Sequence, residues 1–356
     1  MFRKKNCSVL LMGILLVNNV LFAQEDTASC NLSCHCMSNL TPSGVMISHV
    51  HPKGEWMFSY RYMNMGMKGL LSGSTNTNSD EVFNSYLMNS DAMKMDMHML
   101  MGMYGITDRL TGMLMLNYNV NSMDMSMLTV HSHAMSGMDM SPSTAMKMST
   151  SGLGDLKLSL LYGLIKNMNH QLLVAGGISI PTGSIEVQGL KDDMMYAKNR
   201  LPYMMQLGSG TVDITPTVSY IFQQNDFAFS TQVSSTFRTS QNSVGYQLGN
   251  EYSIGIWGAY NWWNNFSSSI RFEGQSIEKI KGIDPTIYSF NEISANPSNY
   301  GGKKLITYIG TAYQFDQSFL NKFRIGVEYG IPIYQNVNGI QNKLMHSLFA
   351  SLSYSF

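Results

Sequence analysis

Charged residues are scarce in this sequence. Asp, Glu, Lys and Arg make up 13% of its 356 residues, about half of the roughly 25% that is usual in soluble domains. The hydrophobic fraction of 44% is ordinary, and the formal net charge is zero. Neither nucleic acid nor an anionic membrane surface is therefore indicated as a partner. At this length, the low charge favours one large β-barrel over two soluble domains.

Long hydrophobic runs are also missing after residue 23, which excludes a membrane-spanning helix there. The apolar run within residues 1–23 follows Arg3, Lys4 and Lys5 and ends at the small residue Ala23, a pattern that predicts a secretory signal peptide. We therefore expect export to the periplasm, the outer membrane or the outside of the cell.

Cysteine is rare, and what remains after loss of Cys7 with the signal peptide lies in one place. Residues 24–54 are expected to form a Cys/His-rich periplasmic segment, whose candidate ligands are Cys30, Cys34, His35 and Cys36. Three cysteines cannot pair completely, so the group either holds a soft metal ion or forms one disulfide with a spare thiol. Lipidation of Cys30 is disfavoured, because residues 27–29 lack the leucine of such signals.

From Trp56 onward, apolar and polar residues alternate in segments of about ten residues, which predicts β-strands. Residues 57–67, for example, place Phe58, Tyr60 and Tyr62 on one face and methionine, serine and arginine on the other. Predicted strands begin near residues 56, 93, 110, 153, 171, 212, 227, 251, 266, 303, 323 and 345.

The predicted connections alternate between short and long, as periplasmic turns and extracellular loops do in outer-membrane barrels. The short ones are 105–109, 166–170, 223–226 and 261–265; the long ones are 68–92, 121–151, 181–211 and 276–302. The last strand ends on Phe356, which resembles the assembly signal of such barrels. The sequence predicts an all-β fold. Residues 55–356 are expected to form an antiparallel up-and-down transmembrane barrel of about twelve strands (10 to 14) in the outer membrane of a Gram-negative bacterium. At this number of strands the lumen should be narrow or plugged.

Three short motifs carry a family resemblance: GLGD at 152–155, SIPTG at 179–183 and LGSGT at 207–211. They resemble the proteins of the MetA pathway of phenol degradation, which are often labelled as transporters, and the resemblance covers about residues 50–356. The run HPKGEWMFSYRYMNMGMKG and the Met-rich strands resemble a methionine-rich subgroup associated with copper and other heavy metals. The resemblance implies an outer-membrane barrel and supplies no functional residues.

Methionine is abundant, with 31 copies. Met63, Met65 and Met67 share a strand face with Arg61, and Met113 and Met115 share one with polar residues. An arginine facing lipid costs roughly 2–4 kcal/mol at the bilayer midplane, so these faces are predicted to line the lumen.

A methionine stands at every odd position from Met93 to Met103, opposite Lys94, Asp96 and His98. This ladder is predicted to face outward, unless the polar half of the strand stands above the bilayer. Pairing between the two neighbouring strands predicts that His98 lies near Met63 or Met115.

Residues 121–150 are predicted to be an exposed loop in which methionines flank two histidines. Thioethers and imidazoles suit Cu(I) or Ag(I), which gives a second group of candidate ligands: Met123, Met125, Met127, His131, His133, Met138 and Met140. Two other interpretations remain open, namely methionine as a flexible hydrophobe and methionine as an oxidant scavenger.

Charged residues on the predicted lumen face form either a selectivity ring or pairs across neighbouring strands, and pairing is favoured. They are Arg61, Asp155, Lys157, Asp213, Arg238, Arg271, Glu273, Arg324 and Glu328. The sequence has neither a Gly-x-Ser-x-Gly elbow nor a phosphate-binding Gly-rich loop, so an enzyme is not predicted.

Two functions follow from these observations. The first is a transporter or channel that binds or passes Cu(I) or Ag(I) through its Met/His-rich loops and lumen, with outer-membrane lipid around it and periplasmic metal-handling proteins as candidate partners. No cofactor is indicated beyond such an ion. The alternative is an outer-membrane channel for small aromatic or hydrophobic solutes with no metal role.

Overall fold

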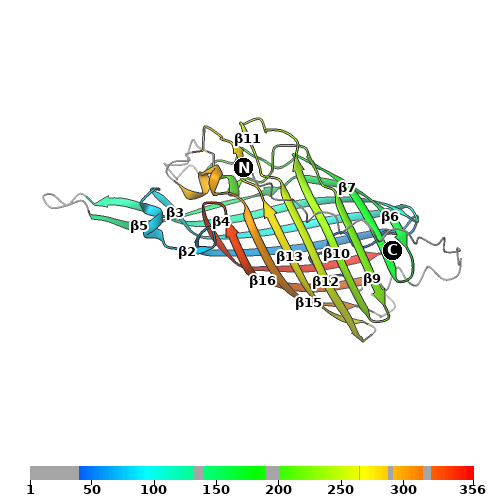
Figure 1. Cartoon of the computed structure of the whole chain (residues 1–356). Coiled ribbons are helices and arrows are strands. Elements are labelled where there is room, and N and C mark those ends of the chain that lie inside the picture. The colour runs from blue at the N-terminus through cyan, green and yellow to red at the C-terminus, as the bar shows by residue number, and fades with distance from the viewer. Residues whose placement is uncertain (1–39, 132–138, 190–199, 264, 288–291, 316–321) are drawn as a thin grey trace, which may run out of the picture.

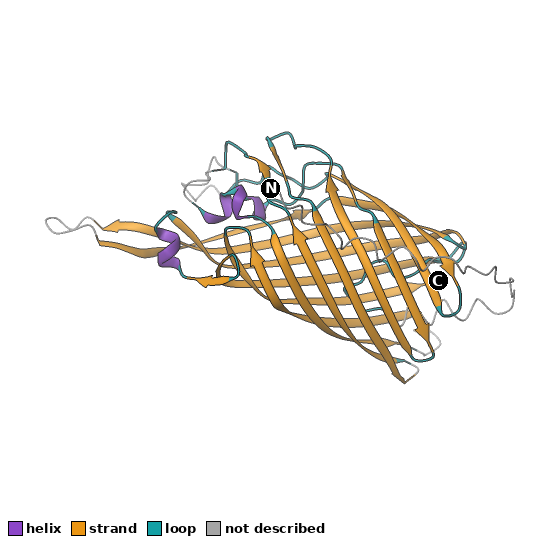
Figure 2. Ribbon diagram, viewed as in Figure 1, coloured by secondary structure: helices purple, strands orange, loops and turns teal. Residues whose placement is uncertain are grey.

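The computed structural model describes residues 40–131, 139–189, 200–263, 265–287, 292–315 and 322–356. They form a β-barrel with short helices only at one end (Figures 1 and 2). None of the described helices is long and apolar enough to cross a membrane. The predicted signal peptide and the CNLSCHC group lie outside the described residues.

The wall is built from long antiparallel strands, as predicted. In chain order the strands are β1 (Trp56–Ser72), β2 (Thr75–Thr77), β3 (Met88–Thr107), β4 (Leu110–His131), β5 (Asp139–Leu153), β6 (Leu156–Lys166), β7 (His170–Ile180), β8 (Asp213–Ile214), β9 (Thr217–Gln224), β10 (Phe227–Arg238), β11 (Tyr246–Gln247), β12 (Glu251–Trp263), β13 (Phe266–Ile277), β14 (Lys281–Gly282), β15 (Gly302–Gln314), β16 (Phe323–Val337) and β17 (Ile340–Ser355). The short helices are α2 (Ser79–Phe83), η1 (Tyr203–Met205), η2 (Ile293–Ala295) and η3 (Pro297–Asn299).

Twelve of the described strands close the barrel, which confirms the predicted count. β2, β5, β8, β11 and β14 are additions to this wall or to the loops. The first and last strands pair along most of their length. Trp56 and Phe356 exchange main-chain hydrogen bonds of 3.0 and 2.9 Å. The terminal aromatic residue therefore completes the ring of strands, which leaves no open sheet edge there.

The outer face carries an apolar band. On β1 the exposed side chains run from Trp56 through Phe58 to Tyr60, and on β4 they include Leu114 and Leu116. Beyond Tyr62 the outward positions of β1 are polar from Asn64 onward, and beyond Tyr118 those of β4 are polar from Ser122 onward, after Val120. The two tyrosines therefore lie at the upper edge of the band, where an aromatic girdle is expected.

The methionine ladder of β3 faces the lumen. The outward orientation is therefore wrong, and the stated exception applies, in which the polar half of the strand stands above the bilayer. Met93, Met99, Met101 and Met103 are at most 3% exposed, whereas Leu100 on the other face is 58% exposed. The reason lies in the register: Met63, Met65 and Met67 pair with Met97, Met95 and Met93. Since directly paired residues share a face, the inward methionines of β1 bring those of β3 with them.

Lys94, Asp96 and His98 consequently point outward, above the apolar band. Lys94 bridges Asp96 at 2.8 Å, and Asp96 also accepts hydrogen bonds of 2.5 Å from Tyr62 and 2.8 Å from Asn64. His98 Nδ1 lies 2.7 Å from the Tyr60 hydroxyl. The predicted neighbourhood of His98 with Met63 or Met115 is therefore wrong, because those side chains lie on the opposite face of the wall.

The prediction that residues 121–151 form a loop is also wrong for most of this range. β4 continues to His131 and pairs with β5 in a hairpin that projects beyond the barrel, at the left of Figure 1. Its inward side chains are buried, with Met123 0% and Met125 1% exposed. The other long connections cover the same end: β11 pairs with β14, and Tyr203, Tyr246 and Ile287 from three connections pack together.

The N-terminal segment, residues 40–52, runs inside the barrel and not as a tail in the periplasm. Leu40, Val45, Ile47 and Val50 are 1–8% exposed. Val50 and Ile47 pack with Met57, Met101 and Met103 of the wall. The apolar run GVMI at 44–47 explains the difference, because only the lumen offers it a surface to cover.

Candidate functional site

A cavity of about 360 Å³ occupies the middle of the lumen, and its two sides differ in chemistry. On one side β1, β3 and β4 supply six methionines: Met63, Met65, Met97, Met99, Met113 and Met115. Tyr308 and Phe349 continue this apolar wall. The other side carries hydroxyl, amide and charged side chains, among them Ser159, Thr215 and Gln232. The lumen is therefore amphipathic across its width.

The methionine wall extends past the barrel mouth as one cluster. Met67, Met88, Met93, Met123, Met125, Met148 and Met205 are its buried methionines, and Met63, Met65, Met95, Met127, Met146 and Met204 pack against them. Strand register pairs Met93 with Met123 and Met123 with Met148. Directly paired side chains have Cβ atoms about 4.5–5.5 Å apart, so thioethers follow one another from the projecting hairpin into the lumen.

Five of the nine charged lumen residues form ion pairs, so the prediction of pairing holds for this part of the set. Arg271 binds Glu328 through two contacts of 2.7 and 3.2 Å and Glu273 through one of 2.6 Å, and its guanidinium lies 3.8 Å from the centre of the Tyr308 ring. On the other side of the barrel, Arg238 bridges Asp213 and Glu251. The charges of Arg271 and Arg238 are therefore neutralised locally.

The N-terminal segment is held in the lumen by polar contacts to the wall. Arg61 Nη1 donates to the carbonyl oxygens of Ser43 (3.2 Å) and Val45 (2.7 Å). Arg324 Nη2 donates to that of Thr41 (2.5 Å), and Gly44 N–H donates to Glu328 Oε2 (2.6 Å). The segment separates the central cavity from a second cavity of about 290 Å³ at the end of the barrel that carries the C-terminus.

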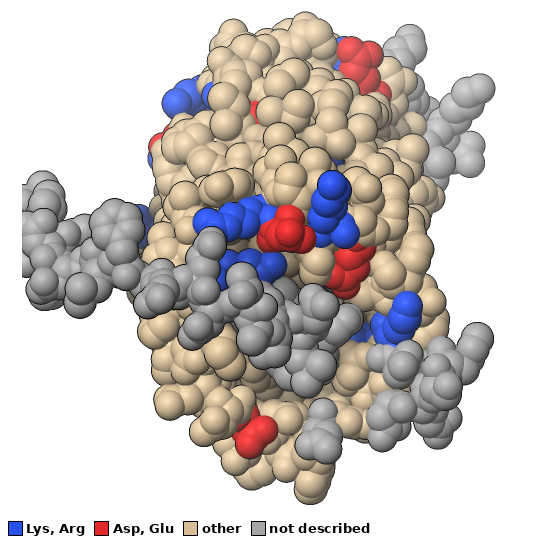
Figure 3. Space-filling model, turned by 90° about the vertical axis from the view of Figure 1, so that its right-hand side faces the viewer, with Lys and Arg blue, Asp and Glu red and all other residues tan. Residues whose placement is uncertain are grey.

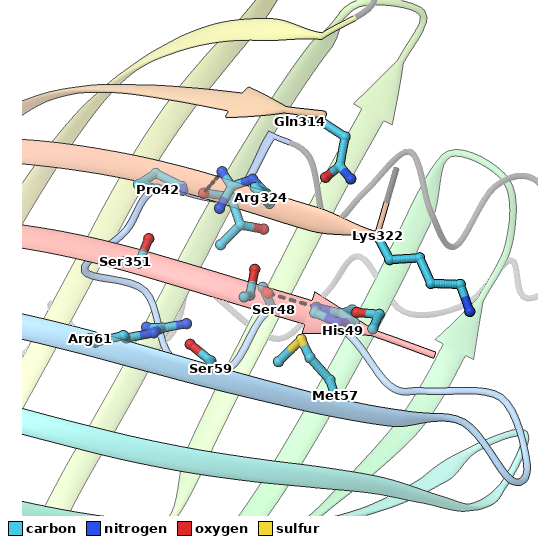
Figure 4. A pocket seen from close by; sticks show the side chains of 13 residues that line it. Pro42, Ser48, His49, Met57, Ser59, Arg61, Gln314, Lys322, Arg324 and Ser351 are labelled. Carbon is cyan, nitrogen blue, oxygen red and sulfur yellow. Dashed lines mark hydrogen bonds between the residues drawn. The ribbon is translucent and has the colours of Figure 1, made fainter. Parts of the chain in front are cut away.

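Figure 4 shows this second cavity, which we call the basic vestibule: the cavity lined by Arg61, Arg324 and Lys322 together with serine hydroxyls. Ser48 and His49 enter it from the N-terminal segment, and their side chains are 2.9 Å apart. Figure 3 faces this end of the barrel and shows charged side chains of both signs gathered near its middle, on an otherwise largely uncharged surface.

The three family motifs meet at the opposite end, around Asp155. Its carboxylate accepts hydrogen bonds from the N–H groups of Gly183 (3.0 Å) and Ser209 (2.8 Å) and from the Ser209 hydroxyl (2.7 Å). A Cβ on Gly183 would lie 2.7 Å from Gly208 Cα. The close approach of these two segments of the chain therefore requires glycine. The motifs thus fix the described parts of the long connection, residues 181–189 and 200–212, at the mouth. In the sequence, this contact is signalled only by the carboxylate of Asp155 and by the glycine residues of the other two motifs.

The structure brings some of the candidate metal ligands together and separates others. Met63, Met65, Met67, Met113, Met115, Met123, Met125 and Met127 belong to the methionine-lined interior, whereas His98 lies outside it. His133, Met138, Cys30, Cys34, His35 and Cys36 fall outside the described residues, and the side chains of His131 and Met140 are not described. Among the described residues, no three His, Cys, Asp or Glu side chains are grouped to hold a metal ion.

Sequence reasoning missed two groups of lumen residues. The sequence pattern predicts the outer face for Met97 and Met99, and only the register with β1 corrects this prediction. Val45, Met46 and Ile47 fall in the segment that is predicted to be periplasmic, although their apolar run indicates burial. Both groups line the central cavity.

Several solved structures resemble this fold. An outer-membrane channel from Pseudomonas putida F1 aligns with a TM-score of 0.57 and 16% identity, over 86% of this chain and 97% of that one. The Pseudomonas putida toluene transporter TodX (TM-score 0.41, 12% identity, 90% and 97% covered) and the NanC porin (0.41, 9%, 83% and 98%) are more distant. Comparison with curated protein sequences gave no match.

A closed barrel with an apolar outer band belongs in the outer membrane of a Gram-negative bacterium, and the solved structure that aligns with a TM-score of 0.57 is described as an outer-membrane channel. A family model matches residues 104–328, more than half of the chain. The chain therefore belongs to the family described as "Putative MetA-pathway of phenol degradation".

Proposed function

We propose that this barrel is an outer-membrane channel for small hydrophobic solutes, aromatic compounds in particular. The observation that carries the proposal is the amphipathic central cavity, whose methionine side continues to the mouth of the barrel. Methionine is flexible and polarizable, and its sulfur makes favourable contacts with aromatic rings. A wall of such residues accommodates apolar solutes of different shapes, whereas the lumen of a porin is polar.

The chain contains a reporter for this cavity. Trp257 lines it and is 2% exposed, while Trp56, Trp262 and Trp263 are 42–71% exposed. Naphthalene should therefore quench the Trp257 fluorescence of the detergent-purified barrel in a saturable way, and Trp257→Phe should remove that signal. Flux of the same solute should be measured in vesicles with a lipopolysaccharide outer leaflet.

Substitutions at Met97, Met99 and Met113 test the chemistry of the wall. Replacing all three by glutamine should weaken naphthalene binding by roughly a hundredfold, because three lost apolar contacts at about 1 kcal/mol each remove about 3 kcal/mol in total. Replacing them by leucine should leave binding within about twofold, since the wall stays apolar and similar in volume. Equal binding by the two triple variants would reject the proposal.

A second candidate function, passage of Cu(I) or Ag(I), is favoured by one observation: paired strands place methionines opposite methionines, as in Met63 with Met97 and Met65 with Met95. Thioethers are soft ligands that suit these ions. The same variants separate the two functions, because leucine removes the sulfurs of Met97, Met99 and Met113 and keeps the apolar wall. Ag(I) stoichiometry on refolded protein should fall in the leucine variant if the ion binds there, and an unchanged stoichiometry would exclude this site.

A further inference from the structure

Gly255 leaves an open place in the lining of the central cavity. It lies in β12, on the inward face that also carries Ser253 and Trp257. Apart from its two chain neighbours, no atom of the described residues lies within 4 Å of a Cβ built at this position. Two other lumen-facing glycines differ, because a Cβ at Gly177 or Gly310 would lie 2.4 or 2.8 Å from the nearest side chain. The space over Gly255 therefore belongs to the cavity.

The strand itself gives no reason for a glycine at this position. A glycine inside a strand weakens it and usually marks a bulge, a bend, a positive φ, or the close approach of a ligand or of another part of the chain. The pairing of β12 runs through Gly255 without a register shift, opposite Gln232 of β10 and Glu273 of β13. Gly255 is not among the glycines with positive φ, and no described segment approaches it. Of these uses, the approach of a ligand is the one that fits.

Contacts of the neighbouring side chains keep this space open. The carboxylate of Glu273 accepts hydrogen bonds from Arg271 Nη1 (2.6 Å) and from Gln275 Nε2 (3.0 Å), so it is held along its own strand. The ring of Trp257 packs against the N-terminal segment. Both side chains are thus fixed by other partners, and neither covers Gly255.

Gly255 also stands across the lumen from the methionine wall. In the closed ring, β12 is separated from β3 by five strands on each side: β13, β15, β16, β17 and β1 on one, and β4, β6, β7, β9 and β10 on the other. β3 carries Met97 and Met99, which line the same cavity. A side chain at position 255 would extend toward this wall, so its absence widens the cavity in the direction from β12 to β3.

We propose that Gly255 is a specificity-determining residue of the central cavity, because its missing side chain makes room, opposite the methionine wall, for the second ring of a fused bicyclic aromatic solute. This inference deepens the proposed function, on which it rests, by naming the size class of the solute. A solute with one ring is accommodated by the methionine wall alone, whereas one with two fused rings also occupies the space over the Gly255 backbone. The cavity volume of about 360 Å³ lies within the roughly 300–1,000 Å³ of small-molecule pockets.

Binding of naphthalene and of benzene to the barrel in lipid nanodiscs tests this assignment, with empty nanodiscs as the blank. Gly255→Val should weaken naphthalene binding by about tenfold, because the added methyl groups occupy the space of the second ring. Benzene binding should change by at most about twofold, so the ratio of the two affinities should fall. Gly255→Ala, which adds one methyl group, should weaken naphthalene binding by roughly threefold.

Gly176→Val is the matched control. Gly176 lies in β7 on the exposed outer face, and a Cβ there also meets nothing within 4 Å. This variant should bind both solutes as the unmodified protein does. Unchanged naphthalene binding in Gly255→Val, or an equal loss of benzene and naphthalene binding, would overturn the inference.

Folding is checked by heat-modifiable migration. Valine is favoured in strands, and Gly255→Ala carries the test alone should Gly255→Val not fold, with an unchanged ratio of the two affinities again overturning the inference.

The outcomes for Gly255 and for the proposed function are distinguishable. If the unmodified barrel binds both solutes and the ratio of their affinities is the same in the Gly255 variants, the size limit is refuted and the proposed function stands. If it binds neither solute, both are refuted. If the ratio falls in Gly255→Val although the glutamine and leucine triple variants of the methionine wall bind naphthalene equally, the proposed function loses its basis and the size limit stands.

Discussion

At the scale of single residues, Asp155 connects two segments at the mouth of the barrel. One carboxylate accepts three hydrogen bonds from Gly183 and Ser209, which belong to two different family motifs. The sequence showed the motifs and placed Asp155 on the lumen face, but it could not show that they meet. Their meeting depends on how the long connection 181–212 folds back, and no local pattern of residues encodes that.

Asp155→Asn should loosen this connection. An amide oxygen is a weaker acceptor than a carboxylate, and its NH₂ group faces the donors of Gly183 and Ser209, so the loss should be about 2–3 kcal/mol of local stability. Tryptic cleavage between residues 183 and 209 should become faster while the barrel stays resistant. Asp80→Asn, at an exposed position in α2, should leave the cleavage rate unchanged; equal rates in both variants would contradict the assigned role.

Two tyrosines between the loops, the buried Tyr246 and the half-buried Tyr300, make the cap over the mouth sensitive to alkali. Burial raises the pKa of Tyr300 to about 12 and that of Tyr246 above its ordinary value of 10.0. The native state therefore keeps protons that the unfolded loops lose, so these groups contribute stability that is complete below pH 10 and is lost as the pH rises through 12. The absorbance change at 295 nm above pH 11 should be smaller in Tyr246→Phe and Tyr300→Phe, and superimposable titration curves would contradict the burial of both rings.

At the scale of elements, the strands of the wall were predictable because each shows its apolar face to lipid and its polar face to the lumen. The strand that carries Met93–Met103 breaks this rule, since its lumen face is apolar and its outer face is polar where it stands above the band. Local alternation then gives the wrong orientation, and only pairing with β1 and β4 decides it. The hairpin of β4 and β5 has the same arrangement, with an apolar inner face and a polar outer face, and its sequence therefore resembles that of a loop.

Substitutions on the two faces of this hairpin should differ in their effect on its stability. Met125 is 1% exposed within the methionine cluster, so Met125→Lys places a charge where it has no partner and should destabilise the hairpin by several kcal/mol. Hydrogen exchange of the upper half of β4 should accelerate accordingly. Asp124→Lys makes a similar side chain one residue away on the exposed face and should change exchange little; comparable acceleration in both would disprove the facing of this strand.

The N-terminal segment is the element that narrows the lumen, and Gly44 lets it lie close to the wall. A Cβ at this position would be 2.2 Å from Arg271 Nη2 and 2.8 Å from Glu328 Oε2. Gly44→Val should therefore push the segment off the wall and raise the single-channel conductance in planar bilayers. Gly176→Val, where a Cβ meets nothing within 4 Å, should conduct as the unmodified protein does, and an unchanged conductance in Gly44→Val would show that the segment does not limit ion flow.

At the scale of the whole molecule, the barrel combines a lipid-facing shell, which the sequence predicts strand by strand, with a filled interior, which it does not. The shell follows from periodicity in each strand, and the closure between β1 and β17 follows from the even strand count. The filling comes from chain segments distant in sequence, such as residues 40–52 and the connection 181–212. Their positions are set by contacts to several strands at once, and these contacts exist only after the barrel has closed.

Glu328 joins the shell to its filling, since it binds Arg271 of β13 from β16 and also accepts the Gly44 N–H. Glu328→Gln leaves Arg271 buried with its charge only partly compensated by Glu273, and such a change costs about 3–5 kcal/mol. The temperature of heat-modifiable migration should fall and the segment should become accessible to protease. Replacing both partners, Arg271→Met with Glu328→Leu, should restore much of the barrel stability because no charge then remains unpaired. It should not restore protection of the segment, because leucine cannot accept the Gly44 hydrogen bond. Recovery of both properties together would mean that the ion pair alone holds the segment, and recovery of neither would mean that the pair does not stabilise the wall.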